Sequence, residues 1–403
     1  MASIMKICKS FTIQRCSLII VYCLIFCGAV SCTKDNGPAT PVNYSYTVPQ
    51  YTSDGWDVSS LSDEGMNEQE LAGMMNFIMG TENHRIHGII IIKNGKLVFE
   101  EYFKGNLFDT NEVESEGSYI PFHRDTLHYM ASVSKSVTSA LYGIAGDEGL
   151  VGNVSEKLLN YYPEYSSVLT GQKEDITVEH FLAMSAGLAW DESSVGYGDP
   201  ANDVTALFYS ADPTKYILEK SLETAPGTAF HYNSGYANVL AEIIRRQYGS
   251  TALDYARVKL FEPLQIEKFR WDMIHSGYLF ASGGLYLKPR DIAKIGQLYL
   301  NGGTWKGQRI VSQEWVDASV ESFINPGASG FANGYGYQWW LNTFYVGGGR
   351  FDCFMAVGWG DQLMYVFPEG NLVVVFTCGN FYHSAEIPPH HMVSNNILPA
   401  LSD

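Results

Sequence analysis

Ser132 and Lys135 are the pair of residues whose types and spacing first indicate chemistry. A serine hydroxyl is a weak nucleophile until a neighbouring base removes its proton. A lysine amine can be that base when burial or nearby positive charge lowers its pKa. Two residues three positions apart on a helix share one face, so their side chains can meet. The pair therefore predicts a nucleophile that carries its own base.

The segment that must position this pair, residues 130–145, has the pattern of a helix. Its apolar residues recur at the helical period and predict one buried face: Val133, Val137, Ala140, Leu141, Ile144 and Ala145. Ser132 falls in the first turn of that helix. The same S-x-x-K spacing also occurs from Ser31 to Lys34. The spacing alone is therefore equally compatible with a helical serine followed by a solvated lysine.

Tyr232 is the candidate for moving a proton beside this pair. It follows a Pro226-Gly227 turn and precedes a helical pattern over residues 236–244. A phenol next to an ammonium group can act as an acid or a base. The chain contains 26 tyrosines, and the alternative is a core tyrosine with a satisfied hydroxyl group.

Acyl chemistry also needs two backbone N–H groups that face the developing oxyanion. Ser132 can supply one from the start of its helix. The second is expected at about Trp359, because Gly358 and Gly360 on either side permit close approach of the backbone. The alternative is a glycine-rich hairpin turn with an exposed tryptophan.

Taken together and in this order, these elements resemble the serine β-lactamase-related family. The likeness is nearest to class C β-lactamases and the esterases and amidases grouped with them, and within these to the aminohexanoate-oligomer (nylon-oligomer) hydrolase branch. The similar segments beside S-x-x-K are residues 95–102, 177–188, 282–286, 290–303 and 335–340. The resemblance implies that Ser132 is the nucleophile, Lys135 its base and Tyr232 the proton shuttle, with no metal or organic cofactor.

Two departures from the family pattern bear on the substrate. The family's Y-x-N motif reads Tyr232-Asn233-Ser234, so Ser234 becomes a candidate for bonding Lys135 or substrate. The K-T-G motif is absent, and Gly358-Trp359-Gly360 takes its place, as in esterase and amidase members. A lysine there would bind the carboxylate of a β-lactam or a D-Ala terminus. Gly358, Gly360 and Trp190 are further candidates for substrate contact, although Trp190 could equally serve packing.

These departures favour an exported serine hydrolase that cleaves an ester or amide through an acyl-enzyme on Ser132. The alternative is a penicillin-binding, D-Ala-peptidase-like or slow β-lactamase-like protein that acts on peptidoglycan or β-lactams. A third hypothesis, a non-enzymatic surface-binding lipoprotein, is disfavoured because Ser132, Lys135 and Tyr232 are all present. The expected substrate is a small molecule or short oligomer.

The fold class expected from the pattern is α+β, with an antiparallel sheet flanked by helices and a mostly helical subdomain. The resemblance makes this a β-lactamase/transpeptidase-like fold. The predicted strands are residues 88–92, 97–103, 350–357, 362–367 and 371–377, and the predicted helices are 67–79, 176–188 and 291–300. Residues 389–401 could form a final short helix. Residues 66–403 should form the hydrolase domain, with an α/β part at about 66–145 and 335–403 and a helical part at about 146–334.

The N-terminus has the features of a lipoprotein signal peptide, residues 1–31. Basic residues precede an apolar run at 17–28, and Ala29-Val30-Ser31-Cys32 resembles a lipobox. Cys32 would then carry a lipid, and residues 32–65 would form a tether and lead-in. The expected location is the bacterial cell envelope, on the periplasmic or the cell-surface side of the outer membrane. The alternatives are an ordinary signal peptide cut nearby or an uncleaved anchor.

Net charge and cysteine content limit the classes of partner and of cofactor that the protein could bind. Three of the 26 basic and none of the 43 acidic residues lie within residues 1–31, which leaves a formal charge of −20 beyond them. Nucleic acid and anionic membrane surfaces would repel such a chain. Cys353 and Cys378 are expected as buried free thiols on strands that are not neighbours. The chain has no H-E-x-x-H and no G-x-S-x-G motif, which disfavours a metallohydrolase and the usual α/β-hydrolase elbow.

Overall fold

The protein is described by a computed structural model that covers residues 43–110, 117–275, 277–327 and 332–401. The predicted signal peptide, Cys32 and the first part of the predicted tether lie outside these residues. Within the described ranges, no helix is both long and apolar enough to span a membrane.

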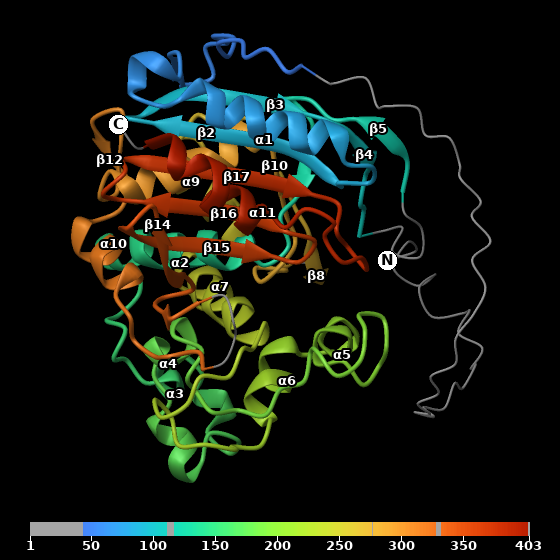
Figure 1. Ribbon diagram of the computed structural model, residues 1–403. Coiled ribbons are helices and arrows are strands. Elements are labelled where there is room, and N and C mark those ends of the chain that lie inside the picture. The colour runs from blue at the N-terminus through green and yellow to red at the C-terminus, as the bar shows by residue number, and fades with distance from the viewer. Residues whose placement is uncertain (1–42, 111–116, 276, 328–331, 402–403) are drawn as a thin grey trace, which may run out of the picture.

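An eight-stranded sheet forms the upper half of the molecule in Figure 1 and joins the two ends of the described chain. Its order is β1-β3-β2-β17-β16-β15-β14-β13. The strands are β1 (Asp57–Val58), β2 (Ile86–Lys93), β3 (Lys96–Tyr102), β13 (Gly334–Tyr335), β14 (Trp340–Val346), β15 (Gly349–Gly358), β16 (Gln362–Phe367) and β17 (Leu372–Cys378). The predicted strands are therefore confirmed. The sheet is mixed rather than wholly antiparallel, because β1 runs parallel to β3.

The central strands are buried on both faces, which explains their continuous apolar sequences. In β2 and β17, Ile91 pairs with Val374 and both side chains are fully buried. β2 turns into β3 at Asn94 and Gly95, whose φ angles of 53° and 75° suit a tight hairpin. Adjacent β-branched pairs on such a sheet stabilise it by packing.

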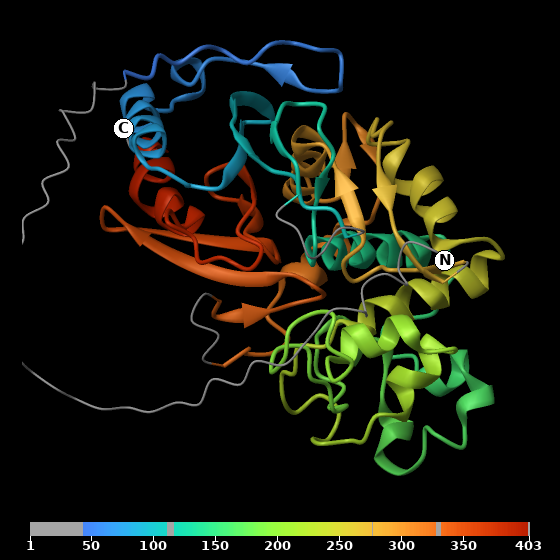
Figure 2. The same cartoon turned by 90° about the vertical axis from the view of Figure 1, so that its right-hand side faces the viewer.

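Helices cover both faces of the sheet. Figure 2 shows the sheet from its side, with α1 (Glu68–Gly80) and the C-terminal α11 (Pro389–Met392) over one face. The other face packs against α2 (Val133–Asp147) and α9 (Pro289–Leu300). The predicted helices at 67–79 and 291–300 are confirmed within two residues at each end.

The helical part lies below the sheet in Figure 1. It comprises α3 (Leu158–Tyr161), α4 (Val178–Leu182), α5 (Asp203–Tyr209), α6 (Pro213–Glu219), α7 (Gly235–Tyr248) and α8 (Ala252–Ala256). α7 packs against α2, so the helix after Tyr232 lies directly beside the helix after Ser132. A second, three-stranded sheet of β6 (His128–Tyr129), β10 (Leu285–Leu287) and β7 (Arg270–Trp271) leads the chain into α2.

The single helix expected over residues 176–188 is wrong in its length. α4 covers only Val178–Leu182, capped by Thr177, whose hydroxyl accepts from the backbone N–H of His180. Met184 and Gly187 then adopt left-handed φ angles of 55° and 75°, which no α-helix accommodates. The apolar pattern of residues 183–188 reflects burial of an irregular segment instead.

Cys353 and Cys378 are buried and form no disulfide. They lie on β15 and β17, which are separated by β16. The expected pair of free thiols on non-neighbouring strands is therefore confirmed.

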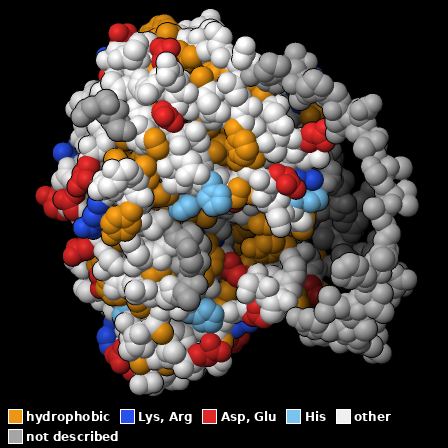
Figure 3. All heavy atoms as spheres, viewed as in Figure 1, with side chains coloured by type: hydrophobic (Ala, Val, Ile, Leu, Met, Phe, Trp, Pro, Cys, Tyr) orange, Lys and Arg blue, Asp and Glu red, His pale blue; other side chains and the backbone are white. Residues whose placement is uncertain are grey.

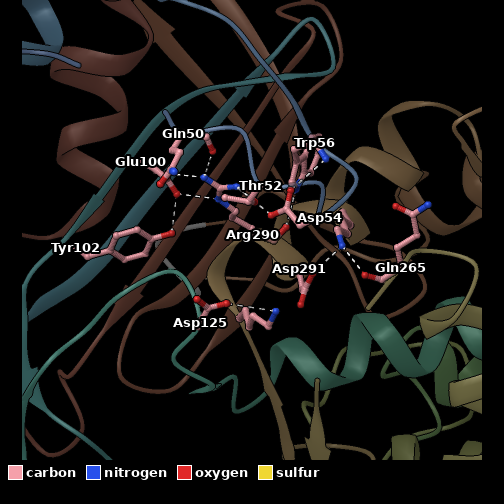
Figure 4. Close-up of polar contacts among 12 residues, drawn as sticks. Gln50, Thr52, Asp54, Trp56, Glu100, Tyr102, Asp125, Gln265, Arg290 and Asp291 are labelled. Atoms are coloured by element: carbon pink, nitrogen blue, oxygen red, sulfur yellow. Dashed lines mark hydrogen bonds and ion pairs between the residues drawn. The ribbon is translucent and has the colours of Figure 1, made fainter. Parts of the chain in front are cut away.

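A buried arginine at the start of α9 fastens the N-terminal lead-in to the domain (Figure 4). The Arg290 guanidinium, 2% exposed, contacts the carboxylates of Asp54 and Glu100. It also donates to the Thr52 hydroxyl at 2.7 Å and to the Gln50 carbonyl at 2.9 Å. Because Glu100 lies on β3, this network joins the lead-in, the sheet edge and α9.

Candidate active site

Ser132 and Lys135 meet at the N-terminal end of α2. The Lys135 Nζ donates to the Ser132 Oγ at 2.8 Å and to the Ser282 carbonyl oxygen at 2.9 Å. Burial lowers the pKa of Lys135 to about 8, although the negative charge of Glu192 acts in the opposite direction. The amine is 2% exposed, so its neutral form is accessible near neutral pH. The geometry provides a nucleophile with a base in contact.

The backbone before Ser132 holds an uncommon conformation. Ala131, a residue with a Cβ, has a φ of 45°, which costs energy and is found most often at functional sites. This turn carries the chain from Met130 into α2 and leaves the Ser132 side chain at the border of two cavities. Ser134 stabilises the turn by donating to the Ala131 carbonyl at 2.6 Å.

Tyr232 lies against the same pair. Its ring centroid is 4.9 Å from the Lys135 Nζ, and the Ser132 side chain lies close enough to the hydroxyl to act on its pKa, in the lowering direction. The ring also stacks on Trp340, with centroids 5.8 Å apart. Burial is the largest cause that raises the pKa of Tyr232, with Glu192 adding to it. The phenol therefore stays protonated near neutral pH and can donate a proton.

The strand end predicted to complete an oxyanion site lies beside the nucleophile. A Cβ on Gly358 would come within 2.4 Å of the Met130 carbonyl oxygen, so only glycine permits β15 to end so close to the turn before Ser132. Among described residues, the N–H groups of Ser132 and Trp359 donate no hydrogen bond in turns or loops. Both are thus available to a substrate oxygen. Gly358 and Gly360 line the same cavity as Ser132.

Ser234 does not contact Lys135. Its hydroxyl donates to the Glu192 Oε1 at 2.9 Å and its backbone N–H to the Glu192 Oε2 at 2.9 Å. The Trp190 Nε1 donates to the same Oε2 at 2.6 Å. Trp190 is 6% exposed and is not part of the lining of either cavity at Ser132, which favours the packing alternative. Trp190 instead fixes the carboxylate of Glu192.

Glu192 is the residue of this site that the sequence analysis missed. It borders the same cavity as Ser132 and Tyr232. The sequence offered two signals for Glu192: its charge and its position two residues after Trp190. They were not sufficient, because the local sequence pattern does not show where this segment runs in the fold. Ser282, whose carbonyl accepts from Lys135, was likewise recognised only as part of a similar segment.

Two cavities meet at Ser132. The first, of about 260 Å³, is mainly apolar, and its aromatic lining includes Phe108, Phe208 and Phe280. The second, of about 680 Å³, is bordered by Tyr232, Trp340 and the segment from Val357 to Asp361. Trp359 borders both. Within the described residues, no cluster of His, Cys, Asp or Glu is suited to hold a metal ion.

This arrangement of serine, buried lysine and tyrosine on an α+β fold defines a serine hydrolase site. Residues 63–387 match the family model described as Beta-lactamase, and the chain belongs to that family. The protein is an enzyme of the serine hydrolase type.

Individual relatives agree with this assignment. The chain is 30% identical over 284 residues to the 6-aminohexanoate-dimer hydrolase of Paenarthrobacter ureafaciens, which covers 66% of this chain and 69% of that protein. It superposes on a penicillin-binding protein homologue from Caulobacter crescentus with a TM-score of 0.63 and 17% identity, covering 84% of this chain and 98% of that one. A family VIII carboxylesterase gives a TM-score of 0.62 and 16% identity, with coverages of 88% and 100%. The β-lactamase/transpeptidase-like fold is therefore confirmed.

Proposed function

We propose that the protein hydrolyses an ester or amide bond through an acyl-enzyme formed on Ser132. The observation that carries the proposal is the 2.8 Å contact between the Lys135 Nζ and the Ser132 Oγ, with the lysine buried and its pKa lowered. A base in contact with the hydroxyl is the requirement for serine to attack a carbonyl at neutral pH.

In the first half-reaction, neutral Lys135 takes the proton of the Ser132 hydroxyl as the Oγ attacks the substrate carbonyl. The N–H groups of Ser132 and Trp359 hold the resulting oxyanion. Tyr232 gives its proton to the leaving oxygen or nitrogen, the bond to that atom breaks, and Lys135 returns a proton to the phenolate. In the second half, water attacks the acyl-enzyme, loses its proton to Lys135, and the Ser132 oxygen leaves with a proton.

The apolar cavity supports an apolar acyl group. Its volume of about 260 Å³ and its phenylalanine walls suit a short to medium hydrocarbon chain beside Ser132. Tyr232, the proton donor to the leaving group, borders only the other cavity. The acyl and leaving groups are thus assigned to opposite sides of Ser132. The names of the hydrolase and carboxylesterase relatives support the same pair of bond types.

The alternative of a penicillin-binding or β-lactamase-like protein has less support. Recognition of a substrate carboxylate needs a cation in the site, and neither lining of the two described cavities includes a lysine or an arginine. The glycines and Trp359 stand where a family lysine would provide one.

A fluorophosphonate probe tests the nucleophile directly. We expect the wild-type protein to be labelled on Ser132 and to hydrolyse p-nitrophenyl butyrate, because the probe traps an activated serine. Ser132→Ala should abolish both, while Ser136→Ala, a change in another serine of the same helix, should abolish neither. Equal labelling of Ser132→Ala would refute the assignment. Rapid nitrocefin cleavage without ester hydrolysis would favour the alternative.

We further propose that the protein is held in the bacterial cell envelope by a lipid on Cys32, as the lipobox-like sequence supports. Cells grown with an alkyne fatty acid should yield a labelled wild-type protein that fractionates with membranes. Cys32→Ala should lose the label, whereas Cys27→Ala should keep it. A labelled Cys32→Ala protein would contradict the proposal.

A further inference from the structure

The larger cavity at Ser132 has an unusual set of polar groups. Its lining includes the carboxylates of Glu192 and Asp361 and the amide of Asn380, but no lysine or arginine. Figure 3 shows this face of the molecule hollowed between the sheet and the helical part, with hydrophobic and acidic side chains around the hollow. The cavity is therefore rich in acceptors, and His383 is its basic side chain in place of a lysine or an arginine.

Glu192 is a carboxylate held in place by neutral donors. Three donors hold it: the Trp190 Nε1, the Ser234 N–H and the Ser234 hydroxyl. In the described part of the chain, neither Glu192 nor Asp361 forms an ion pair. A charge held rigidly by neutral donors cannot turn away into solvent, so it acts on whatever occupies the cavity.

Asn380 fixes the second carboxylate of the cavity, that of Asp361. The Asn380 side chain is 5% exposed, and its Nδ2 donates to the Asp361 Oδ2 at 2.7 Å. This bond fixes the orientation of the amide, and the Asn380 Oδ1 has no hydrogen-bond partner among the described residues. The bond from the Nδ2 therefore holds the Asp361 carboxylate in place at the wall of the cavity.

Aromatic rings complete the walls. Trp340, Trp359, Tyr197 and Tyr382 all border the cavity. The Trp359 ring packs edge-on to the Tyr382 ring, with centroids 4.8 Å apart. The centroid of the Tyr197 ring lies 5.1 Å from that of Trp359. Aromatic faces attract cations through their quadrupoles, most strongly where water is excluded.

We infer that this cavity binds an ammonium group on the leaving side of the substrate. The inference rests on the proposed function, because the leaving side is the side that Tyr232 serves. Glu192 and Asp361 would attract the positive charge and accept its N–H groups, and the rings would cover the attached carbons. The natural substrate class is then an apolar acyl ester or amide of an amino alcohol or a diamine.

The catalytic base is compatible with such a ligand. Lys135 acts as a base only in its neutral form, so the enzyme form that binds substrate productively has no ammonium at Lys135, which gains its charge only on taking the Ser132 proton. The formal net charge of −17 over the full sequence also favours approach of cations.

Pairs of esters that differ only in charge test the inference. Choline butyrate and 3,3-dimethylbutyl butyrate have the same shape, as do 4-aminobutyl and pentyl butyrate. We expect the wild-type kcat/KM to favour the charged member of at least one pair by about tenfold or more. A preference in the choline pair alone would mean that the aromatic rings contribute most of the recognition of the ammonium group. A preference in the primary-amine pair alone would mean that the hydrogen-bond acceptors contribute most of it. No preference in either pair overturns the inference.

Two variants locate the effect. Glu192→Gln should lower the ratio of charged to neutral kcat/KM by about tenfold, whatever it does to either rate alone. Glu314→Gln removes the same charge from an exposed position on α10 (Gln313–Val320) and should leave both rates and the ratio unchanged. The role of Glu192 would be refuted if the ratio of charged to neutral kcat/KM were the same in the wild type and Glu192→Gln. It would also be refuted if Glu314→Gln lowered that ratio as much as Glu192→Gln does.

Failure of this inference can be told apart from failure of the proposed function. If the neutral esters are hydrolysed in a Ser132-dependent way but charge makes no difference, only the ammonium site is wrong. If no ester is cleaved and fluorophosphonate does not label Ser132, the proposed function itself fails. A thermal melt of each variant establishes that it is folded.

Discussion

At the scale of single residues, the site depends on the protonation state of one amine. Burial places the pKa of Lys135 at about 8, so roughly a tenth of the molecules carry the neutral base at pH 7. Glu192 raises that pKa, and it raises the pKa of Tyr232 as well. The same carboxylate thus keeps the phenol protonated for its work as a proton donor while it limits the fraction of neutral lysine.

The rate should therefore rise with pH. Because the reactive form has lost a proton from Lys135, kcat/KM for a neutral ester should increase as the pH rises through about 8. It should decrease as the pH is lowered from 8 toward 6. Lys135→Arg should lower kcat/KM by roughly 100-fold or more, since a guanidinium stays protonated and cannot act as a base. Steady-state rates between pH 6 and 10 measure both effects.

Lys215→Arg provides the matched control, because Lys215 is exposed on α6 and makes only a surface ion pair with Glu219. It should keep the wild-type profile. A flat profile for the wild type, or near-normal activity in Lys135→Arg, would show that another group removes the proton of Ser132.

At the scale of elements, sequence pattern predicted what local periodicity determines. The hairpin at Asn94-Gly95, the strands near the C-terminus and α9 all have strong patterns, and each is present. α4 ended early because Met184 and Gly187 take left-handed conformations, which a hydrophobic pattern does not reveal. The short parallel pairing of β1 with β3 could not be predicted in the same way, because it depends on how the N-terminal segment packs in the tertiary structure.

The same division applies to the candidate site. Ser132 and Lys135 lie on one helical turn, so their contact could be predicted from spacing alone. Ser234 and Glu192 are 42 residues apart and meet only because the chain returns through α5 and α6 to the start of α7. Asn380 reaches the cavity from beyond β17, and its role emerges only from its contact with Asp361. Contacts made by irregular segments were beyond prediction from this sequence.

At the scale of the whole molecule, Arg290 links parts of the chain that are far apart. Arg290→Met should lower the free energy of unfolding by about 3–5 kcal/mol, because it leaves the largely buried carboxylate of Glu100 without its cation. Urea denaturation followed by tryptophan fluorescence measures the change as a shift of the midpoint.

Arg350→Met is the comparison, since Arg350 pairs with Asp352 at the surface with 66% of its side chain exposed. Such a pair is expected to contribute less than about 1 kcal/mol. Similar shifts for the two variants would mean that the network around Arg290 adds nothing beyond an exposed ion pair.

The pairing of β2 with β17 also has a consequence for how the chain matures. Ile86–Lys93 is synthesised early and can pair with β3 at once, but its partner on the other side exists only when Leu372–Cys378 leaves the ribosome. Pairings so distant in sequence fold slowly, because a long loop must close before they form. The sheet that supports α2 can thus be completed only after nearly all of the chain has been made.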